Sequence, residues 1–324
     1  MRQCSDATVV REQASIFYFS PGQSDEMPKS LIELYTHMFI EDLSRALLPV
    51  WTTRDGSKIS VELTPPNSDL RGKLSAAFNI SRQDYYDRDL VRVLSEFLRL
   101  TMVELCIDRR MVFEIAYLRP KPEEPRDAFK LFHINSRQIV HRWGRWYQIV
   151  PPDIARDRQV AESISLPCEN ISVFTLPDHL ARPIASAMEA LSALSDDRWH
   201  GLAIQAQEEN IPYDFSVHQR SMNLALAESV REIGWTARGL FNQQITNYYS
   251  LRQNLRFKLF ALGVREALLA QLNAVLKRVG PALGCSTQLS ISGLPTRSNL
   301  EEALAELASG EKPFTEIMDE IRNL

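Results

Sequence analysis

The pattern of apolar residues changes character near residue 183, and this change limits the folds open to the chain. Before it, two amphipathic segments at 28–50 and roughly 83–105 are accompanied by short β-prone runs. After it, apolar residues recur at helical spacing, above all in a long run near 240–279. Strand and helix patterns segregated in this way predict an α+β fold, helix-rich, with a small β-hairpin or β-sheet block in the N-terminal half and a long helix in the C-terminal half.

The individual elements follow from local signals. Asp55-Gly56 between two β-prone runs, in VWTTRDGSKISVEL, predicts a hairpin, and Ser81 is a candidate N-cap for the second helix. Further strands are predicted at 111–119 (MVFEIAYLR), in FKLFHI, RQIVHRW and RWYQIV, at 169–177 and at 287–295, with Gly144 in a turn. Further helices are predicted at 183–195, 215–232, 240–279 and 298–308. These elements suggest an N-terminal arm over 1–27, an α+β region over 28–180 and a helical region over 181–324.

Charge and composition exclude several classes of protein. With 37 basic and 41 acidic residues the net charge is -4, which excludes a uniformly basic nucleic-acid-binding protein but allows a local basic patch. The N-terminal sequence has no apolar core of a signal peptide, and no run approaches the ~20 apolar residues of a membrane span. Four cysteines without a CxxC pair are typical of reduced thiols. We therefore expect an intracellular chain that does not enter a membrane.

The motifs of common catalytic sites are missing from the sequence. It contains no P-loop, no G-x-G-x-x-G after a strand, no H-E-x-x-H and no G-x-S-x-G. We therefore predict no catalytic residue, no metal site and no cofactor. Two weaker candidates remain: His133 and His141 could meet across strands to bind a metal or a proton, and Cys106 lies near Arg109 and Arg110. The ordinary interpretation is favoured for both, namely two solvent-facing strand histidines and a buried cysteine.

The distribution of charge along the chain is uneven. Residues 217–280 hold nine basic and three acidic residues, a net charge of +6, whereas residues 296–324 hold three basic and seven acidic residues, a net charge of -4. The basic segment can neutralise the acidic one within a fold or between subunits, face a phosphate backbone, or form a solvated amphipathic face. The candidates for DNA-proximal charge are Arg238, Arg252, Arg256 and Lys258.

A second candidate interface is the aromatic and basic cluster HRWGRWYQ at 141–148. Arg142 and Arg145 could pair with phosphates, and Trp143 and Trp146 could stack on bases. Alternating aromatic residues in two strands can equally cover one face of a sheet. The cluster therefore supports an alternative function, an intracellular nucleic-acid-associated binding protein of a mobile element.

Several segments share a pattern with one known family. A first helix leads into a hairpin with DG in its turn (LIELYTHMFIEDLSRALLPVWTTRDGSKISVEL). The strand MVFEIAYLR, the β-region that contains FHINSRQIV and the strand ENISVFTLP follow in order. Near the end come the helix REALLAQLNAVL and the run ALAELASGEKPFTEIMDEIR, with Leu307, Gly310, Thr315, Glu316 and Arg322 at its characteristic places. In this order of elements, over roughly 28–320, the chain resembles the portal proteins of tailed phages. It departs from them in VELCIDRRMVFEI, which lacks a usual glycine, and in a short stretch between 180 and 235.

The resemblance implies a ring, typically of about twelve subunits, at one vertex of a capsid. Such a homo-oligomer passes double-stranded DNA through its channel, connects head to tail and has no active site of its own. It also implies the capsid, terminase and head–tail adaptor proteins as partners, and a location in the virion, with assembly in the host cytoplasm. On this interpretation the helix at 240–279 and residues 242–249 frame the channel.

Overall fold

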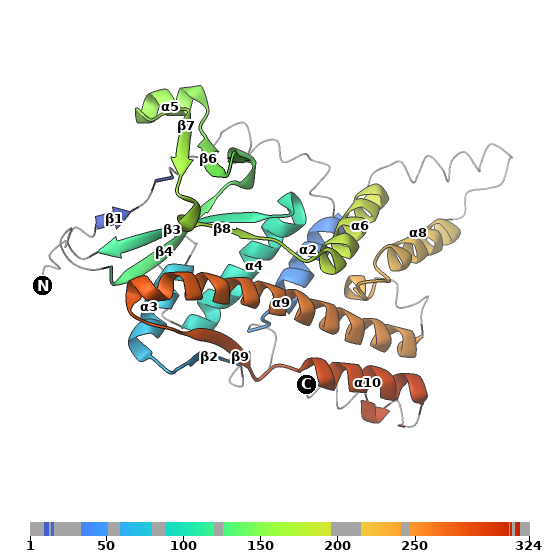
Figure 1. The fold of residues 1–324 in the computed structure, drawn as a ribbon. Coiled ribbons are helices and arrows are strands. Elements are labelled where there is room, and N and C mark those ends of the chain that lie inside the picture. Colours follow the sequence, from blue (N-terminus) through green and yellow to red (C-terminus); the bar gives the residue numbers. More distant parts are fainter. Residues whose placement is uncertain are drawn as a thin grey trace, which may run out of the picture. The chain divides into compact units, whose positions relative to one another are not determined.

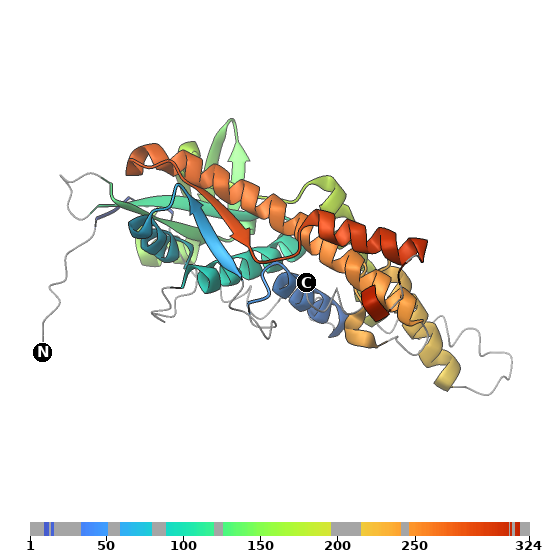
Figure 2. The same ribbon diagram turned by 90° about the horizontal axis from the view of Figure 1, so that it is seen from below.

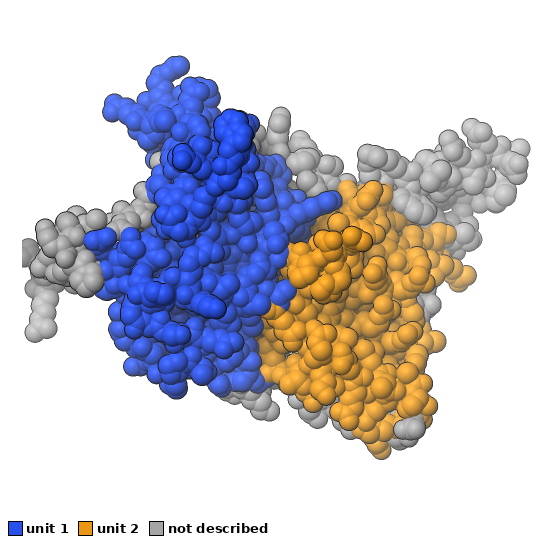
Figure 3. All heavy atoms as spheres, in the orientation of Figure 1, with its two compact units in different colours: residues 1–19, 49–175, 267–293 blue, residues 20–48, 176–266, 294–324 orange. Residues whose placement is uncertain are grey.

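The computed structural model describes residues 10–12, 14–15, 34–50, 59–79, 89–119, 126–195, 215–240, 246–310, 312 and 315–317. The fold is α+β, with three small antiparallel sheets and a long helix in the C-terminal half (Figure 1). Two compact units divide the chain, unit 1 with residues 1–19, 49–175 and 267–293, and unit 2 with residues 20–48, 176–266 and 294–324 (Figure 3).

The largest sheet lies in unit 1 and is organised around β3 (Met111–Arg119). On one edge β3 pairs along most of its length with β4 (Ala128–Ile134). Its other edge pairs with two short strands, β8 (Ile171–Phe174) at the start of β3 and β1 (Val10–Glu12) at its end. The strand predicted at 111–119 is confirmed with these bounds. It begins at Met111 because the preceding helix ends at Arg109, which adopts the left-handed region at φ 60°. The strand is buried from Met111 to Tyr117, and its sequence MVFEIAYLR is accordingly apolar on both faces except at Glu114 and Arg119.

Two helices of unit 1, α3 (Ser68–Phe78) and α4 (Leu90–Asp108), pack against this sheet. Phenylalanine rings join them to it: Phe97 of α4 stacks on Phe113 of β3 with ring centroids 5.4 Å apart, and Phe78 of α3 lies 5.5 Å from Phe97. The cap of α4 is Asp89, whose carboxylate accepts a hydrogen bond from the amide of Val91. The predicted cap, Ser81, lies outside the described residues. No helix was predicted at 68–78, although Asn67 caps it.

A second sheet of unit 1 contains β5 (Ile139–Arg142), β6 (Arg145–Ile149) and β7 (Ser163–Leu166) in that order. Its first two strands form the predicted hairpin with Gly144 in the turn. The short helix α5 (Pro152–Arg158) and β7 were not predicted. Pro152 at the helix start suits a first-turn position.

The third sheet of unit 1 joins segments from opposite ends of the chain. Its two strands, β2 (Ser60–Thr64) and β9 (Gln288–Ser292), pair antiparallel and lie side by side in Figure 2. The turn of the predicted hairpin, Asp55-Gly56, lies outside the described residues. Within the described chain β2 takes its partner from the C-terminal half, and Asn273 caps the pairing by exchanging two hydrogen bonds with the backbone of Leu289.

Unit 2 is helical. Its helices are α2 (Leu34–Ala46), α6 (Asp178–Ser195), α8 (Phe215–Ser229), the first part of α9 (Asn247–Leu283) and α10 (Arg297–Ser309). Leu251, Leu255 and Leu262 of α9 form one apolar cluster with α10 residues such as Leu300 and Leu307. The predicted leucine periodicity therefore corresponds to a real packing face. Thr296 and Asn299 form a capping box that fixes the start of α10.

Helix α9 contributes to both units, because unit 1 takes over at residue 267. In unit 1 its side chains bind strand ends: the amide group of Gln271 exchanges hydrogen bonds with the backbone of Thr175, and Arg278 donates to the carbonyl of Ile171. Among the described helices α9 alone is long and apolar enough to cross a membrane, by length and composition. Its packing against α10 buries part of that apolar surface.

The units differ from the predicted division of the chain. A change of unit at 175/176 lies close to the predicted boundary at 180, but α2, predicted to begin the α+β region, belongs to unit 2. The strand β9 and the end of α9, predicted in the helical region, belong to unit 1. The predicted arm 1–27 is described only at residues 10–12 and 14–15, where β1 pairs with β3.

A buried carboxylate anchors the N-terminal segment to β3. Glu114 is fully buried, and its two carboxylate oxygens accept hydrogen bonds from the backbone amides of Ala14, at 2.7 Å, and Ser15, at 2.9 Å. The hydroxyl of Ser15 donates a third hydrogen bond to the same group. A buried charge needs such partners, because burying it without them is costly. The carboxylate and the segment after β1 therefore depend on each other.

We expect Glu114→Gln to lower the free energy of unfolding by about 1–3 kcal/mol, because the amide NH2 group would face backbone donors and leave them unpaired. The matched control is Glu62→Gln on β2, whose carboxylate also accepts from serine hydroxyls but at the surface. Urea unfolding followed by circular dichroism measures both. Equal effects of the two substitutions would contradict the anchoring role of Glu114.

Candidate nucleic-acid interface

The segment that follows α8, residues 230–240, is held tightly within unit 2. Gly234 lies at φ +87°, and a Cβ atom there would come within 2.5 Å of the carbonyl oxygen of Gln253 in α9. Glycine is therefore required for the close approach of this segment to α9. Arg256 of α9 also donates a hydrogen bond to the carbonyl of Glu232. The next residue, Trp235, packs its ring edge-on against Phe39 of α2, with centroids 5.4 Å apart.

Asp42 of α2 joins this segment to the first helix. Its carboxylate accepts a hydrogen bond from the indole Nε1 of Trp235 at 2.9 Å and from Nη2 of Arg238 at 2.7 Å. Arg238 also donates to Glu41, which lies beside Asp42. Ala237 and Arg238 both adopt positive φ, 45° and 53°, a conformation that is unfavourable for residues other than glycine and asparagine. The strained backbone is retained because Arg238 binds two carboxylates there.

The two carboxylates offset the charge of Arg238. Hydrogen bonds to Asp42 and Glu41 raise the pKa of Arg238, and the hydrogen bond from Arg238 lowers the pKa of Glu41. We call Glu41, Asp42 and Arg238 the arginine–carboxylate cluster. Within it two negative charges face one positive charge, so the position of Arg238 offers little positive potential to a phosphate.

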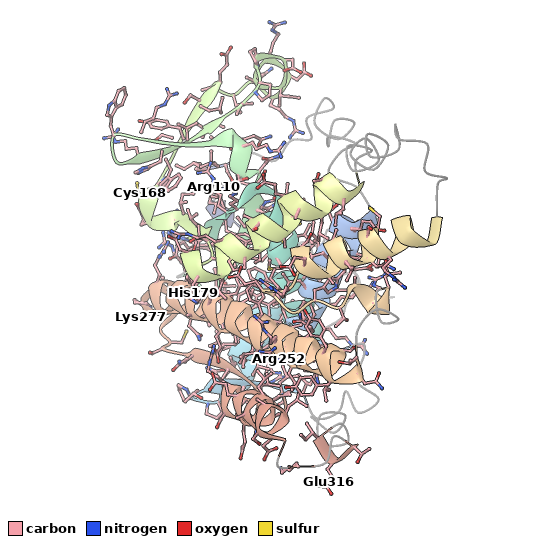
Figure 4. The ribbon with its side chains drawn as sticks, turned by 90° about the vertical axis from the view of Figure 1, so that its right-hand side faces the viewer. Arg110, Cys168, His179, Arg252, Lys277 and Glu316 are labelled. Carbon is pink, nitrogen blue, oxygen red and sulfur yellow. The ribbon has the colours of Figure 1, made fainter. Side chains whose placement is uncertain are left out.

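The other three predicted DNA-proximal residues lie within two turns of α9. Arg252 is exposed and is labelled in Figure 4. Arg256 is half-buried and donates to the Glu232 carbonyl. Lys258 is also half-buried, and its burial lowers its pKa. All three residues lie on one helix. Of the three, only Arg252 is exposed, and it has no described ion pair.

The net charge of +6 counted over residues 217–280 does not form one surface. Lys277 and Arg278 belong to unit 1, whereas the other seven basic residues belong to unit 2. Arg231 pairs with Glu228 on the same helix turn, and burial lowers the pKa of Arg265, which donates to the carbonyl of Leu47. The basic residues serve different local contacts, which a count along the sequence cannot separate.

The second predicted interface, HRWGRWYQ, is the β5–β6 hairpin in unit 1. Trp146 turns one side toward an apolar cluster that includes Val112, Ile139 and Leu166, and its ring lies 4.6 Å from that of His141. Trp143 instead stands in the turn with 94% of its surface exposed. Arg142 and Arg145 are both exposed and form the last pair of the ladder. The four predicted residues therefore divide into three exposed ones and one that supports the sheet.

The two histidines proposed as a pair belong to different sheets. His133 is on β4 beside the ring of Phe113, and burial lowers its pKa, so the prediction of a solvent-facing residue is wrong for His133. His141 is on β5 and exposed, as predicted. Within the described ranges no group of three or more His, Cys, Asp or Glu residues could hold a metal ion. Burial raises the pKa of Cys106 to about 12, which favours the interpretation of a buried, unreactive thiol.

Comparison with models of known protein families finds no match, and comparison with curated protein sequences finds no similar protein.

The ion pairs of the arginine–carboxylate cluster lead us to expect that the free energy of unfolding depends on pH. We expect Arg238→Gln to lower the free energy of unfolding at neutral pH by about 1 kcal/mol, the order of an ion-pair contribution that is partly screened by solvent. Because the folded-state pKa of Glu41 is lowered, its contribution is present above the ordinary carboxyl pKa and is lost as the pH falls through the lowered value.

Urea unfolding of both proteins between neutral and acidic pH tests this, with Arg45→Gln as the control. Arg45 pairs with Glu41 at the helix surface, where a side chain 58% exposed contributes a few tenths of a kcal/mol. A difference between Arg238→Gln and the unmodified protein that persists unchanged at acidic pH would argue against an ionic origin.

Proposed function

We propose that this chain is a portal-like ring subunit that forms a channel for double-stranded DNA at a capsid vertex, connects head to tail and docks the packaging motor. The observation that carries the proposal is the order of the structural elements. The elements α2, β2, α4, β3, β4, β8, α9 and α10 occur in the same order as the segments in which the sequence resembles the portal family, with further elements between them, and β2 pairs with β9 within the described chain. The partners on this proposal are the terminase and the capsid and head–tail adaptor proteins, and the protein is part of the virion.

The distribution of charge is compatible with a channel. DNA that must slide needs a surface with few strong contacts, because each neutralised phosphate releases counterions and adds to the affinity. In unit 2 the carboxylates of Glu41 and Asp42 offset Arg238, and Arg252 remains exposed on α9. Repetition of one exposed cation around a ring gives a sparse positive field without a tight binding site.

The helix α9 suits a part of a ring wall. At about 1.5 Å per residue its 37 residues extend over about 55 Å. Its first part already has one apolar side filled by α10 within the subunit. Exposed positions such as Arg252 and Tyr248 lie near its N-terminal end, next to residues 242–245 of the predicted channel loop, which lie outside the described residues.

Light scattering of the purified protein tests the ring. We expect a particle of about twelve times 37.0 kDa, since portal-like subunits assemble by cyclic symmetry. Negative-stain images would then display rings with a central hole. A monomer at all concentrations would contradict the proposal and leave the alternative, an intracellular nucleic-acid-associated binding protein of a mobile element.

Reversal of the exposed charge tests the channel. We expect Arg252→Glu to reduce the DNA retained per particle without altering ring mass, because it reverses one exposed charge in every subunit. Arg220→Glu on α8 is the matched control, an equal change of charge at an exposed position outside α9. Arg238 is unsuitable for this experiment because its replacement also disrupts the arginine–carboxylate cluster. Equal DNA content in the two variants would remove Arg252 from the channel.

A further inference from the structure

The turn of the β5–β6 hairpin is an unusual place for a tryptophan. We call Arg142, Trp143, Gly144 and Arg145 the hairpin tip. Trp143 and Gly144 are the two central residues, at φ 48° and 74°, and a two-residue turn with both φ values positive is of type I′. Asparagine, aspartate and glycine are preferred at such positions, whereas an aromatic residue there is strained. Local stability therefore does not explain Trp143.

Burial does not explain it either. Trp143 is 94% exposed, while the next most exposed large apolar side chain among the described residues, Leu224, is 51% exposed. The nearby Trp146 gains stability by packing on the sheet, but Trp143 has no described ring or hydrogen-bond partner. A large apolar side chain that costs stability in the turn and is not buried points to a role in binding.

The two arginines add a second unfavourable feature. Arg142 and Arg145 lie directly opposite each other across the hairpin, and like charges in this position repel. Neither side chain has an ion pair or hydrogen bond with the described part of the chain. Some other surface arginines of unit 1 have partners: Arg137 pairs with Asp108, and Arg99 pairs with Glu96. The positive charge at the hairpin tip is thus concentrated, and no described residue supplies a counter-charge.

The rest of the hairpin holds the tip in place. The sheet that contains the hairpin has a third strand, β7, which pairs with β6. Trp146 packs on the apolar cluster that includes Val112, Ile139 and Leu166. At the turn itself the thiol of Cys168 donates a hydrogen bond to the carbonyl of Gly144; Cys168 is labelled in Figure 4. Trp143 therefore projects from a supported turn, which lowers the conformational entropy lost when a ligand binds.

We propose that the hairpin tip binds single-stranded nucleic acid. Trp143 stacks on one unpaired base, and the guanidinium groups of Arg142 and Arg145 contact phosphates on either side of it. Stacking on an aromatic face together with cations along the backbone is the general mode of recognition of single strands. The proposal goes beyond the channel function and does not depend on it, because the tip lies in unit 1 and Arg252 in unit 2.

The surroundings of Trp143 favour a nucleic acid over a protein partner. A stable protein interface covers about 800 Å² on each side, with an apolar centre depleted in charge. The residues around Trp143 are instead His141, Arg142 and Arg145, all exposed and polar or charged. The nearest exposed apolar side chain of the hairpin, Ile149, lies at the other end of β6. One stacking face between two cations suits a polyanion with exposed bases, whereas a duplex keeps its bases stacked internally.

Trp143→Asn is the decisive variant, because asparagine fits the left-handed turn better than tryptophan and should leave the hairpin at least as stable. We expect its affinity for a fluorescent oligothymidylate of about 16 nucleotides to fall about 5- to 150-fold, the value of one stacked base. An oligouridylate of the same length distinguishes RNA from DNA as the preferred strand. Leu224→Asn on α8 is the control, since Leu224 is an exposed apolar residue outside the hairpin and outside α9.

The arginines are tested by the dependence of binding on salt. For Arg142→Gln with Arg145→Gln we expect the slope of log affinity against log salt to flatten by about 1.4, since each phosphate contact to a single strand contributes about 0.7. Trp143→Asn should leave that slope unchanged. The control is Arg156→Gln with Arg158→Gln on α5, which removes the same charge from exposed positions of the same unit.

Unchanged affinity of Trp143→Asn for both oligonucleotides would overturn the proposal, as would failure of the unmodified protein to bind either at low salt. An equal loss for a duplex of the same length would also overturn it, because no base would then be stacked. If Trp143→Asn changes the particle mass in light scattering and not the binding, the tip is a protein contact. Selective loss of single-strand binding with an unaltered particle mass supports the proposal whether or not a ring forms.

Discussion

The continuous helix α9 is the constraint on which both units depend. Its 37 residues form one continuous helix that is shared by both units. The helical spacing of its side chains therefore decides which of them each unit can contact. In unit 2 the leucines at 251, 255 and 262 supply an apolar face to α10. In unit 1 the helix also buries apolar side chains, such as Leu268, Leu272 and Val275. In addition it donates or accepts hydrogen bonds from Gln271, Asn273 and Arg278 to the backbone of strand ends. One element thus stabilises both units by burial and satisfies backbone groups of the strands in unit 1.

The arginines fall into two groups: those whose side chains bind carboxylates or carbonyls within the fold, and those that are available to a ligand. Arg238 is bound by Glu41 and Asp42, and Arg278 by backbone carbonyls, so both stabilise the fold. Arg252 and the two arginines of the hairpin tip carry no such described partner. The hairpin tip also departs from local rules in its turn residue and its cross-strand pair. Departures from local rules concentrated at one exposed place are the physical basis for assigning it a binding role.

The sequence predicted those elements that carry a strong local signal. The strand at 111–119 and the hairpin around Gly144 were found in place, and α10 agrees within one residue at each end. Helix α3 was not predicted because its apolar pattern is short, although Asn67 caps it. Strand β7 was missed because SISL is too short to alternate clearly, and it forms by pairing with β6.

The sequence by itself determined the α+β class, the long leucine-patterned helix, the hairpin and the candidate cations, because periodicity and turn chemistry act between residues close in the chain. Only the tertiary structure decided that β2 pairs with β9, and that Arg238 is offset by Glu41 and Asp42. It also decided that Trp146 supports a sheet while Trp143 is exposed. Burial and ion pairing depend on residues that are distant in sequence, and no local pattern records which distant residues will meet.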